Sequence, residues 1–134
     1  MYLDACAIVA LIAGEATAPA YAEALAGARD PWTSPLAAWE AIIVLSRPDT
    51  LDCPFSAAER VVVEWLEARD IKLRAPKDPR EVLAHAVAVA ETHGLGKRAL
   101  SNFDCFHYAF AKAAGAPILT LDRLLRETEA ETRP

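Results

Sequence analysis

Residues that mark several common classes of protein are scarce in this sequence. Its 134 residues include only three cysteines, at positions 6, 53 and 105, and no two of them form a Cys-x-x-Cys pair. This spacing argues against a zinc ribbon or a thioredoxin-type motif and favours reduced thiols in a reducing compartment. The apolar runs are shorter than the roughly 18 residues of a membrane-spanning helix. The first 15 residues lack the basic start of a signal peptide, so we expect a cytoplasmic protein without membrane attachment.

Positive charge is scarce as well. Lys and Arg total 14 against 19 Asp and Glu, which gives a formal net charge of −5. A broad basic surface of the kind that grips nucleic acid is therefore not expected. Apolar residues make up 54% of the chain, and 29 of them are alanine. The larger apolar residues that remain are enough for one packed core, which argues against disorder and predicts a single domain over residues 1–134.

Short apolar segments alternate with longer amphipathic ones along the chain. The short segments predict strands at residues 1–4, 32–33, 71–75 and 117–121. The longer segments predict helices at residues 5–13, 19–28, 35–47, 56–69, 79–93, 102–114 and 123–131, with a capping box at 56–59. This alternation is typical of an α/β fold with a parallel central sheet flanked by helices. In such a sheet, we expect the functional site beyond the carboxyl ends of the strands.

Four acidic residues lie in unusually apolar surroundings. Asp4 closes the first expected strand and is followed by nine residues that are Ala, Cys, Ile, Val or Leu. Glu40 stands within LAAWEAIIVL, Asp104 lies between aromatic residues in NFDCFHYAF, and Asp122 closes PILTL. Asp4 and Asp122 thus end strands, while Glu40 and Asp104 lie near the starts of helices that can begin at the same edge of the sheet.

The chemistry of these four carboxylates points to a metal ion. An isolated carboxylate in apolar surroundings is costly unless it is paired or binds a metal. Four oxygen donors without a histidine favour a hard cation, and Mg²⁺ or Mn²⁺ is the natural occupant. Phosphodiester cleavage is the chemistry that uses such a site. For each acid taken singly, a helix cap or a distant basic partner is the alternative explanation.

Three stretches of the sequence carry a family resemblance. They are MYLDACAIVALIAGE, LAAWEAIIVLSR and HGLGKRALSNFDCFHYAFAKAAGAPILTLDRLLRET. Over nearly its whole length the chain resembles a PIN domain, and specifically the VapC toxins of bacterial type II toxin–antitoxin pairs. The resemblance implies a PIN-like fold, metal-dependent cleavage of RNA, homodimers and inhibition by a small VapB-type antitoxin.

The resemblance also implies a set of catalytic and metal-binding residues. Asp4, Glu40 and Asp104 match the family's first three acids, and Asp122 matches the fourth. The stretch at Asp122 is one residue shorter than the family's usual Gly-Asp-Asp-Phe, which leaves Glu129 as a second candidate for the fourth acid. Cys6 replaces the family's usual Ser or Thr two residues after the first acid, and a thiol is a poorer hydrogen-bond donor than a hydroxyl.

Three further residues near these acids have two interpretations each. Lys97 and Arg98 follow a Gly-Leu-Gly stretch, where they either hold RNA phosphates at the mouth of the site or belong to a solvated loop. His107 lies one helical turn after Asp104, where it either transfers protons or simply packs as an aromatic residue.

Two other functions stay open beside the toxin. One is a PIN-type nuclease for RNA maturation, and the other is an inactive PIN-like module that only binds a partner. A neighbouring antitoxin gene or growth arrest on expression would favour the toxin, and stabilisation by Mn²⁺ would argue against the inactive module. Setting the four proposed ligands aside leaves 15 acidic against 14 basic residues, so RNA binding is expected to be local to the metal site.

Overall fold

The centre of the fold is a five-stranded sheet in the order β3-β2-β1-β4-β5, with every neighbouring pair parallel. The computed structural model describes residues 1–94 and 99–134. Each strand is two residues long: β1 (Tyr2–Leu3), β2 (Trp32–Thr33), β3 (Lys72–Leu73), β4 (Ile118–Leu119) and β5 (Thr132–Arg133). The predicted α/β fold with a parallel sheet is thus confirmed.

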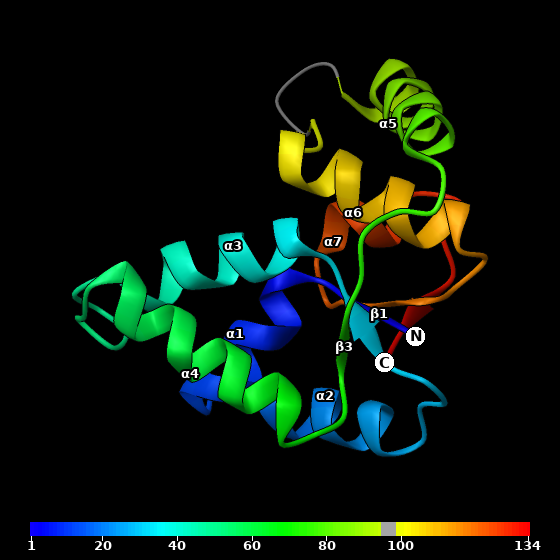
Figure 1. Ribbon diagram of the computed structural model, residues 1–134. Coiled ribbons are helices and arrows are strands. Elements are labelled where there is room, and N and C mark those ends of the chain that lie inside the picture. The colour runs from blue at the N-terminus through cyan, green and yellow to red at the C-terminus, as the bar shows by residue number, and fades with distance from the viewer. Residues whose placement is uncertain (95–98) are drawn as a thin grey trace.

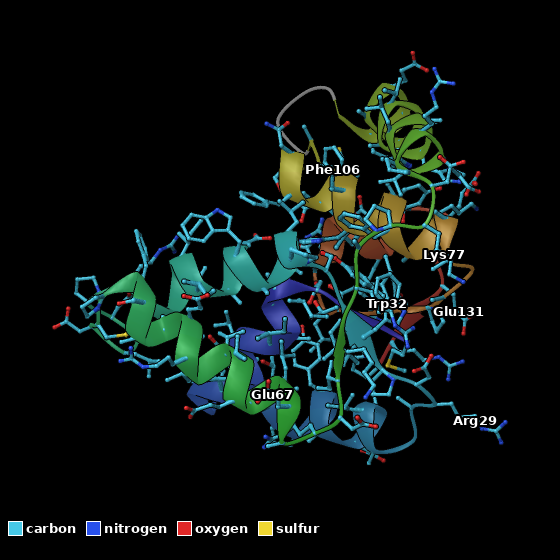
Figure 2. All side chains as sticks on the ribbon, viewed as in Figure 1. Arg29, Trp32, Glu67, Lys77, Phe106 and Glu131 are labelled. Atoms are coloured by element: carbon cyan, nitrogen blue, oxygen red, sulfur yellow. The ribbon has the colours of Figure 1, made fainter. Side chains whose placement is uncertain are left out.

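The helices divide into two groups around the strands. Their bounds are α1 (Ala5–Ala13), α2 (Ala18–Ala26), α3 (Pro35–Leu45), α4 (Phe55–Glu67), α5 (Pro79–His93), α6 (Asn102–Ala113) and α7 (Arg123–Arg126). Figure 1 shows α1, α3 and α4 grouped on one side of the strands and α5, α6 and α7 on the other. This division follows from the right-handed crossover between parallel strands, because the strand order reverses its direction after β3. The reversal places β1 beside β4, and the crevice beyond such a pair is the usual ligand site.

The hydrophobic core fixes the two central strands. Tyr2 and Leu3 of β1 and Ile118 and Leu119 of β4 are completely buried. Alanines on the facing helices, such as Ala7, are buried as well, and their small side chains let the helices approach the sheet closely. The residues that directly follow β1 and β4 are therefore held by a rigid frame rather than by loops alone.

Gly14 ends α1 and turns the chain sharply into α2. It adopts the left-handed conformation, with a φ of 68°, which glycine accepts without steric cost. Among the described residues, no single helix is both long and apolar enough to cross a membrane. Within residues 1–94 and 99–134, only α1 and α2 taken together pass such a test, and they are bent by 111° at their junction.

Two predicted elements are wrong at their ends. The last helix stops at Arg126 instead of residue 131, and the chain goes on into β5, which was not predicted. The open edge of β4 explains this, because the N–H groups of Ile118 and Thr120 donate to the carbonyls of Glu131 and Arg133 at 2.8 and 2.7 Å. The predicted capping box at residues 56–59 does not form either, since α4 begins one residue earlier, at Phe55.

Candidate active site

Asp4 follows β1 directly and caps the amino end of α1. Its Oδ1 atom accepts a hydrogen bond of 2.8 Å from the Ala7 N–H, and only 1% of the residue is exposed. The hydroxyl of Thr120, just after β4, donates a second hydrogen bond to this carboxylate. Burial nevertheless raises the pKa of Asp4 to about 6, although these hydrogen bonds and the nearby His107 act to lower it. The ionised form of Asp4 is therefore poorly stabilised by the protein alone.

Asp122 is linked to Asp4 through one hydroxyl, that of Thr120. The N–H of Asp122 donates to Oγ1 of Thr120 at 3.0 Å, and the same hydroxyl donates to Asp4. The carboxylate of Asp122 caps α7, where its Oδ1 atom accepts from the N–H groups of Leu124 and Leu125 at 2.8 and 3.0 Å. The two acids thus occupy the carboxyl ends of the two central strands.

Asp104 lies in the first turn of α6, where it completes a capping box with Ser101. Its Oδ2 atom accepts from the Ser101 N–H at 2.9 Å, and its own N–H donates to Ser101 Oγ at 3.1 Å. The positive end of the helix dipole also favours a carboxylate at this position. The box fixes where α6 starts and, with it, the direction of the Asp104 side chain.

Glu40 extends from α3 toward α6, where it meets His107. Its Oε2 atom is 2.7 Å from Nε2 of His107, and the other ring nitrogen of His107 is 2.8 Å from the Tyr2 hydroxyl. The histidine is 2% exposed and the Glu40 side chain is 24% exposed. The carboxylate therefore has one end in the protein interior and the other at the surface.

The charges of all four acids raise the pKa of one thiol, that of Cys6. Partial burial, and then the charges of Asp4, Asp122, Glu40 and Asp104, raise the pKa of Cys6 to about 12. The thiol lines a hollow of about 350 Å³, together with Glu40, Asp122 and seven residues from α1 to β4: Ala5, Val9, Glu15, Thr17, Tyr21, Val44 and Leu121. All four acids thus lie within electrostatic reach of one residue that directly follows the end of β1.

The carboxylates do not form a ready-made ligand cage. Within the described parts of the chain, no three His, Cys, Asp or Glu side chains stand together in an arrangement that could hold a metal ion. The cause is local, since Asp104 and Asp122 turn toward helix N–H groups and Glu40 turns toward His107. Glu129 is exposed beyond α7, and its charge is not among those that act on Cys6. Lys97 and Arg98 lie outside the described residues.

The capping box at Asp104 is open to a direct test. Replacing Ser101 with alanine removes the acceptor for the Asp104 N–H, and we expect the free energy of unfolding to fall by about 1 kcal/mol. Ser56 provides the matched control, because it lies exposed in the first turn of α4 and caps nothing. Urea denaturation of the two variants should show a loss for Ser101→Ala and almost no change for Ser56→Ala. Equal losses would contradict the assigned role of Ser101.

A comparison with models of protein families gives a match over almost the whole chain. Residues 1–131 match the model of the PIN domain. The chain belongs to the PIN domain family. Members of this family are generally metal-dependent nucleases, which places the chain in a nuclease superfamily. No curated protein matches the chain in a search of such proteins.

The donor set of this PIN domain fits a divalent metal ion. All four acids supply carboxylate oxygens, which are the ligands that Mg²⁺ and Mn²⁺ prefer. The described residues engage Oδ2 of Asp104, Oδ1 of Asp122 and Oε2 of Glu40 in hydrogen bonds, which leaves the second oxygen of each carboxylate available as a ligand. Asp4, whose ionised form is disfavoured by burial, gains most from a nearby cation.

Sequence reasoning missed the neutral partners of the acids in this PIN domain. Thr120 connects Asp4 with Asp122, and Tyr2 and Ser34 extend the contact between His107 and Glu40 into the core. A signal for Thr120 was present, since a threonine interrupts the apolar run PILTL two residues before Asp122. No such signal pointed to Tyr2, because a tyrosine in a buried strand is ordinary.

The raised pKa of Cys6 gives this PIN domain an internal probe of its acids. Although Cys6 is exposed, we expect its alkylation by iodoacetamide at pH 8 to be slow, because almost none of the thiol is ionised. Asp4→Asn or Asp122→Asn should speed the reaction several-fold by removing one nearby charge. Mass spectrometry of the labelled peptide measures this rate, with Glu129→Gln as the control. A rate that no acid variant changes would show that the charges do not converge on Cys6.

Proposed function

We propose that this PIN domain is a divalent-metal-dependent endoribonuclease that acts as the toxin of a type II toxin–antitoxin pair. The observation that carries the proposal is that Glu40 and Asp122 line one hollow beside Cys6, beyond the carboxyl ends of β1 and β4, and the charges of Asp4 and Asp104 also reach Cys6. The family supports metal-dependent nuclease chemistry, and the VapC-like run of residues 93–128 favours a toxin. RNA is the substrate that this resemblance implies.

Each residue near the proposed metal has a separate role. Asp4, Glu40, Asp104 and Asp122 would hold Mg²⁺ or Mn²⁺, which neutralises the phosphate and lowers the pKa of a bound water when it is present. The hydroxyl of Thr120 holds the Asp4 carboxylate and the backbone of Asp122 at a fixed spacing. The hollow beside Cys6 is the place for the scissile phosphate and its ribose. With a pKa of about 12, the Cys6 thiol stays protonated and does not serve as the nucleophile.

An antitoxin segment is the partner we propose for the outer surface of α3 and α4. Trp39 of α3 is 44% exposed and Phe55 of α4 is 55% exposed, and their rings meet edge to face at 5.5 Å. Val61 and Val63, on the same helix as Phe55, are exposed as well. Apolar surface of this kind is costly in water and is typical of binding sites for amphipathic segments. The family resemblance implies a homodimer in addition, which equilibrium ultracentrifugation would measure.

The proposal is tested with purified protein and in growing cells. Purified protein should cut RNA when Mg²⁺ or Mn²⁺ is present, and its expression in the cytoplasm should arrest growth. Co-expression of the adjacent small gene should restore growth, and its product should co-purify with the protein. Cleavage without growth arrest would favour RNA maturation. Complete lack of cleavage, with a partner still bound, would favour the inactive binding module.

A further inference from the structure

A chain of buried hydrogen bonds runs from the sheet to the Glu40 carboxylate. Oγ of Ser34 is 3.0 Å from the Tyr2 hydroxyl, this hydroxyl is 2.8 Å from Nδ1 of His107, and Nε2 of His107 is 2.7 Å from Glu40. Ser34, Tyr2 and His107 are all buried. The four residues come from the junction of β2 with α3, from β1, from α6 and from α3, so the chain ties together the elements that form the site.

The donors and acceptors in this series of hydrogen bonds fix the direction of each bond when the His107 ring is neutral. A carboxylate only accepts hydrogen bonds, so the nitrogen that faces Glu40, Nε2, must carry the hydrogen. In a neutral ring Nδ1 then lacks a hydrogen and accepts one from the Tyr2 hydroxyl. Burial raises the pKa of Tyr2 far above its usual range, so this hydroxyl keeps its proton and stays a donor. The Tyr2 oxygen in turn accepts from Ser34, whose Oγ atom accepts the Ala37 N–H at 3.1 Å.

We propose that His107 is a positioning residue for Glu40, held in its Nε2–H form by Tyr2 and Ser34. The proposal rests on the proposed function, because it gives Glu40 the role of a metal ligand. A glutamate on a helix surface has several rotamers, and fixing one of them before metal binding removes that entropy cost from the binding step. With Oε2 held by His107, the carboxylate is fixed in one orientation, which would leave its Oε1 atom for the proposed metal.

Two histidine variants separate positioning from simple packing. In His107→Gln the amide nitrogen takes the place of Nε2 and still donates to Glu40, whereas the shorter amide of His107→Asn reaches only the Tyr2 side. We expect His107→Asn to weaken Mn²⁺ binding by about 10–100-fold, and His107→Gln to restore most of the affinity. Electron paramagnetic resonance of free Mn²⁺ measures these affinities, and circular dichroism with urea denaturation checks that both variants fold. A His107→Asn protein that folds and binds Mn²⁺ like the wild type would overturn the proposal.

The tautomer of His107 tests the same proposal without metal or RNA. Nitrogen-15 NMR of the wild-type ring at pH 7.5 should show Nε2–H, and Tyr2→Phe should shift the ring toward Nδ1–H, because Nδ1 has lost its donor. An Nδ1–H ring in the wild type would overturn the positioning role. A wild-type protein that shows the Nε2–H ring yet binds no Mn²⁺ and cuts no RNA would instead refute the proposed nuclease, so the two failures are distinguishable.

Discussion

Asp4→Asn should lower RNA cleavage by at least about a hundredfold and, at the same time, make the metal-free protein more stable by about 1–3 kcal/mol at pH 7.5. Activity falls because the proposed site loses the carboxylate closest to the core. Stability rises because ionised Asp4 is buried with a pKa of about 6, against an ordinary value of 3.8. An asparagine keeps an acceptor for the Ala7 N–H and carries no charge. A single substitution should therefore change activity and stability in opposite directions.

The change of stability with pH shows whether the ionisation of buried Asp4 stabilises or destabilises the fold. Between pH 4 and 6 the folded protein binds more protons than the unfolded chain, because the pKa of Asp4 is raised in the fold. Its contribution to stability is thus complete below about pH 4 and is lost as the pH rises through 6. Urea denaturation in EDTA from pH 4 to 8 should show this loss in the wild type and not in Asp4→Asn. Asp49→Asn, at an exposed position, is the control, and parallel curves for wild type and Asp4→Asn would contradict the account.

Divalent metal should stabilise the protein and restore its activity. Mn²⁺ at a hundred times its dissociation constant should raise the free energy of unfolding by about 2.7 kcal/mol, since it binds only the folded chain. EDTA should abolish both this stabilisation and the cleavage of RNA. Because a bound cation displaces the proton of Asp4, the affinity for Mn²⁺ should fall as the pH drops below about 6. Differential scanning calorimetry with and without Mn²⁺ measures the stabilisation.

Glu40→Gln supplies the matched comparison for the metal experiment. The amide keeps the size of the side chain and an acceptor for His107, so the fold should be retained while the metal loses a charged ligand. Its thermal unfolding should respond to Mn²⁺ much less than that of the wild type, whereas Asp49→Asn should respond fully. An equal response of all three proteins would show that Mn²⁺ binds somewhere other than at Glu40.

The fold was largely predictable because its elements follow local signals. Asp78 with Pro79 and Ser34 with Pro35 mark helix starts, and both side chains cap their helices in the structure. The strand β5 was not predictable, because Thr132 and Arg133 lie in a charged tail and pair only with an edge that the fold supplies. Such pairing depends on where β4 lies and leaves no periodic pattern in the sequence.

The candidate site residues can be proposed from the sequence, but the directions of their side chains cannot. An acid in an apolar stretch or at the end of an apolar strand is visible in a sequence, and this singled out Asp4, Glu40, Asp104 and Asp122. Which way each carboxylate turns depends on partners far along the chain. Glu40 meets a histidine 67 residues away, and this contact carries no local pattern. The order of the strands, which brings the carboxyl ends of β1 and β4 next to each other, is equally a property of the whole fold.

The proposed metal site takes its four acids from separate parts of the fold. Its most direct test is the dissociation constant of Mn²⁺, measured by electron paramagnetic resonance for the wild type and for Asp4→Asn, Glu40→Gln, Asp104→Asn and Asp122→Asn, with Glu129→Gln as the control. We predict that each of the four weakens binding at least about tenfold, as the loss of a charged ligand implies, and that Glu129→Gln leaves it unchanged. Wild-type affinity in the four variants, or a loss confined to Glu129→Gln, would contradict the account.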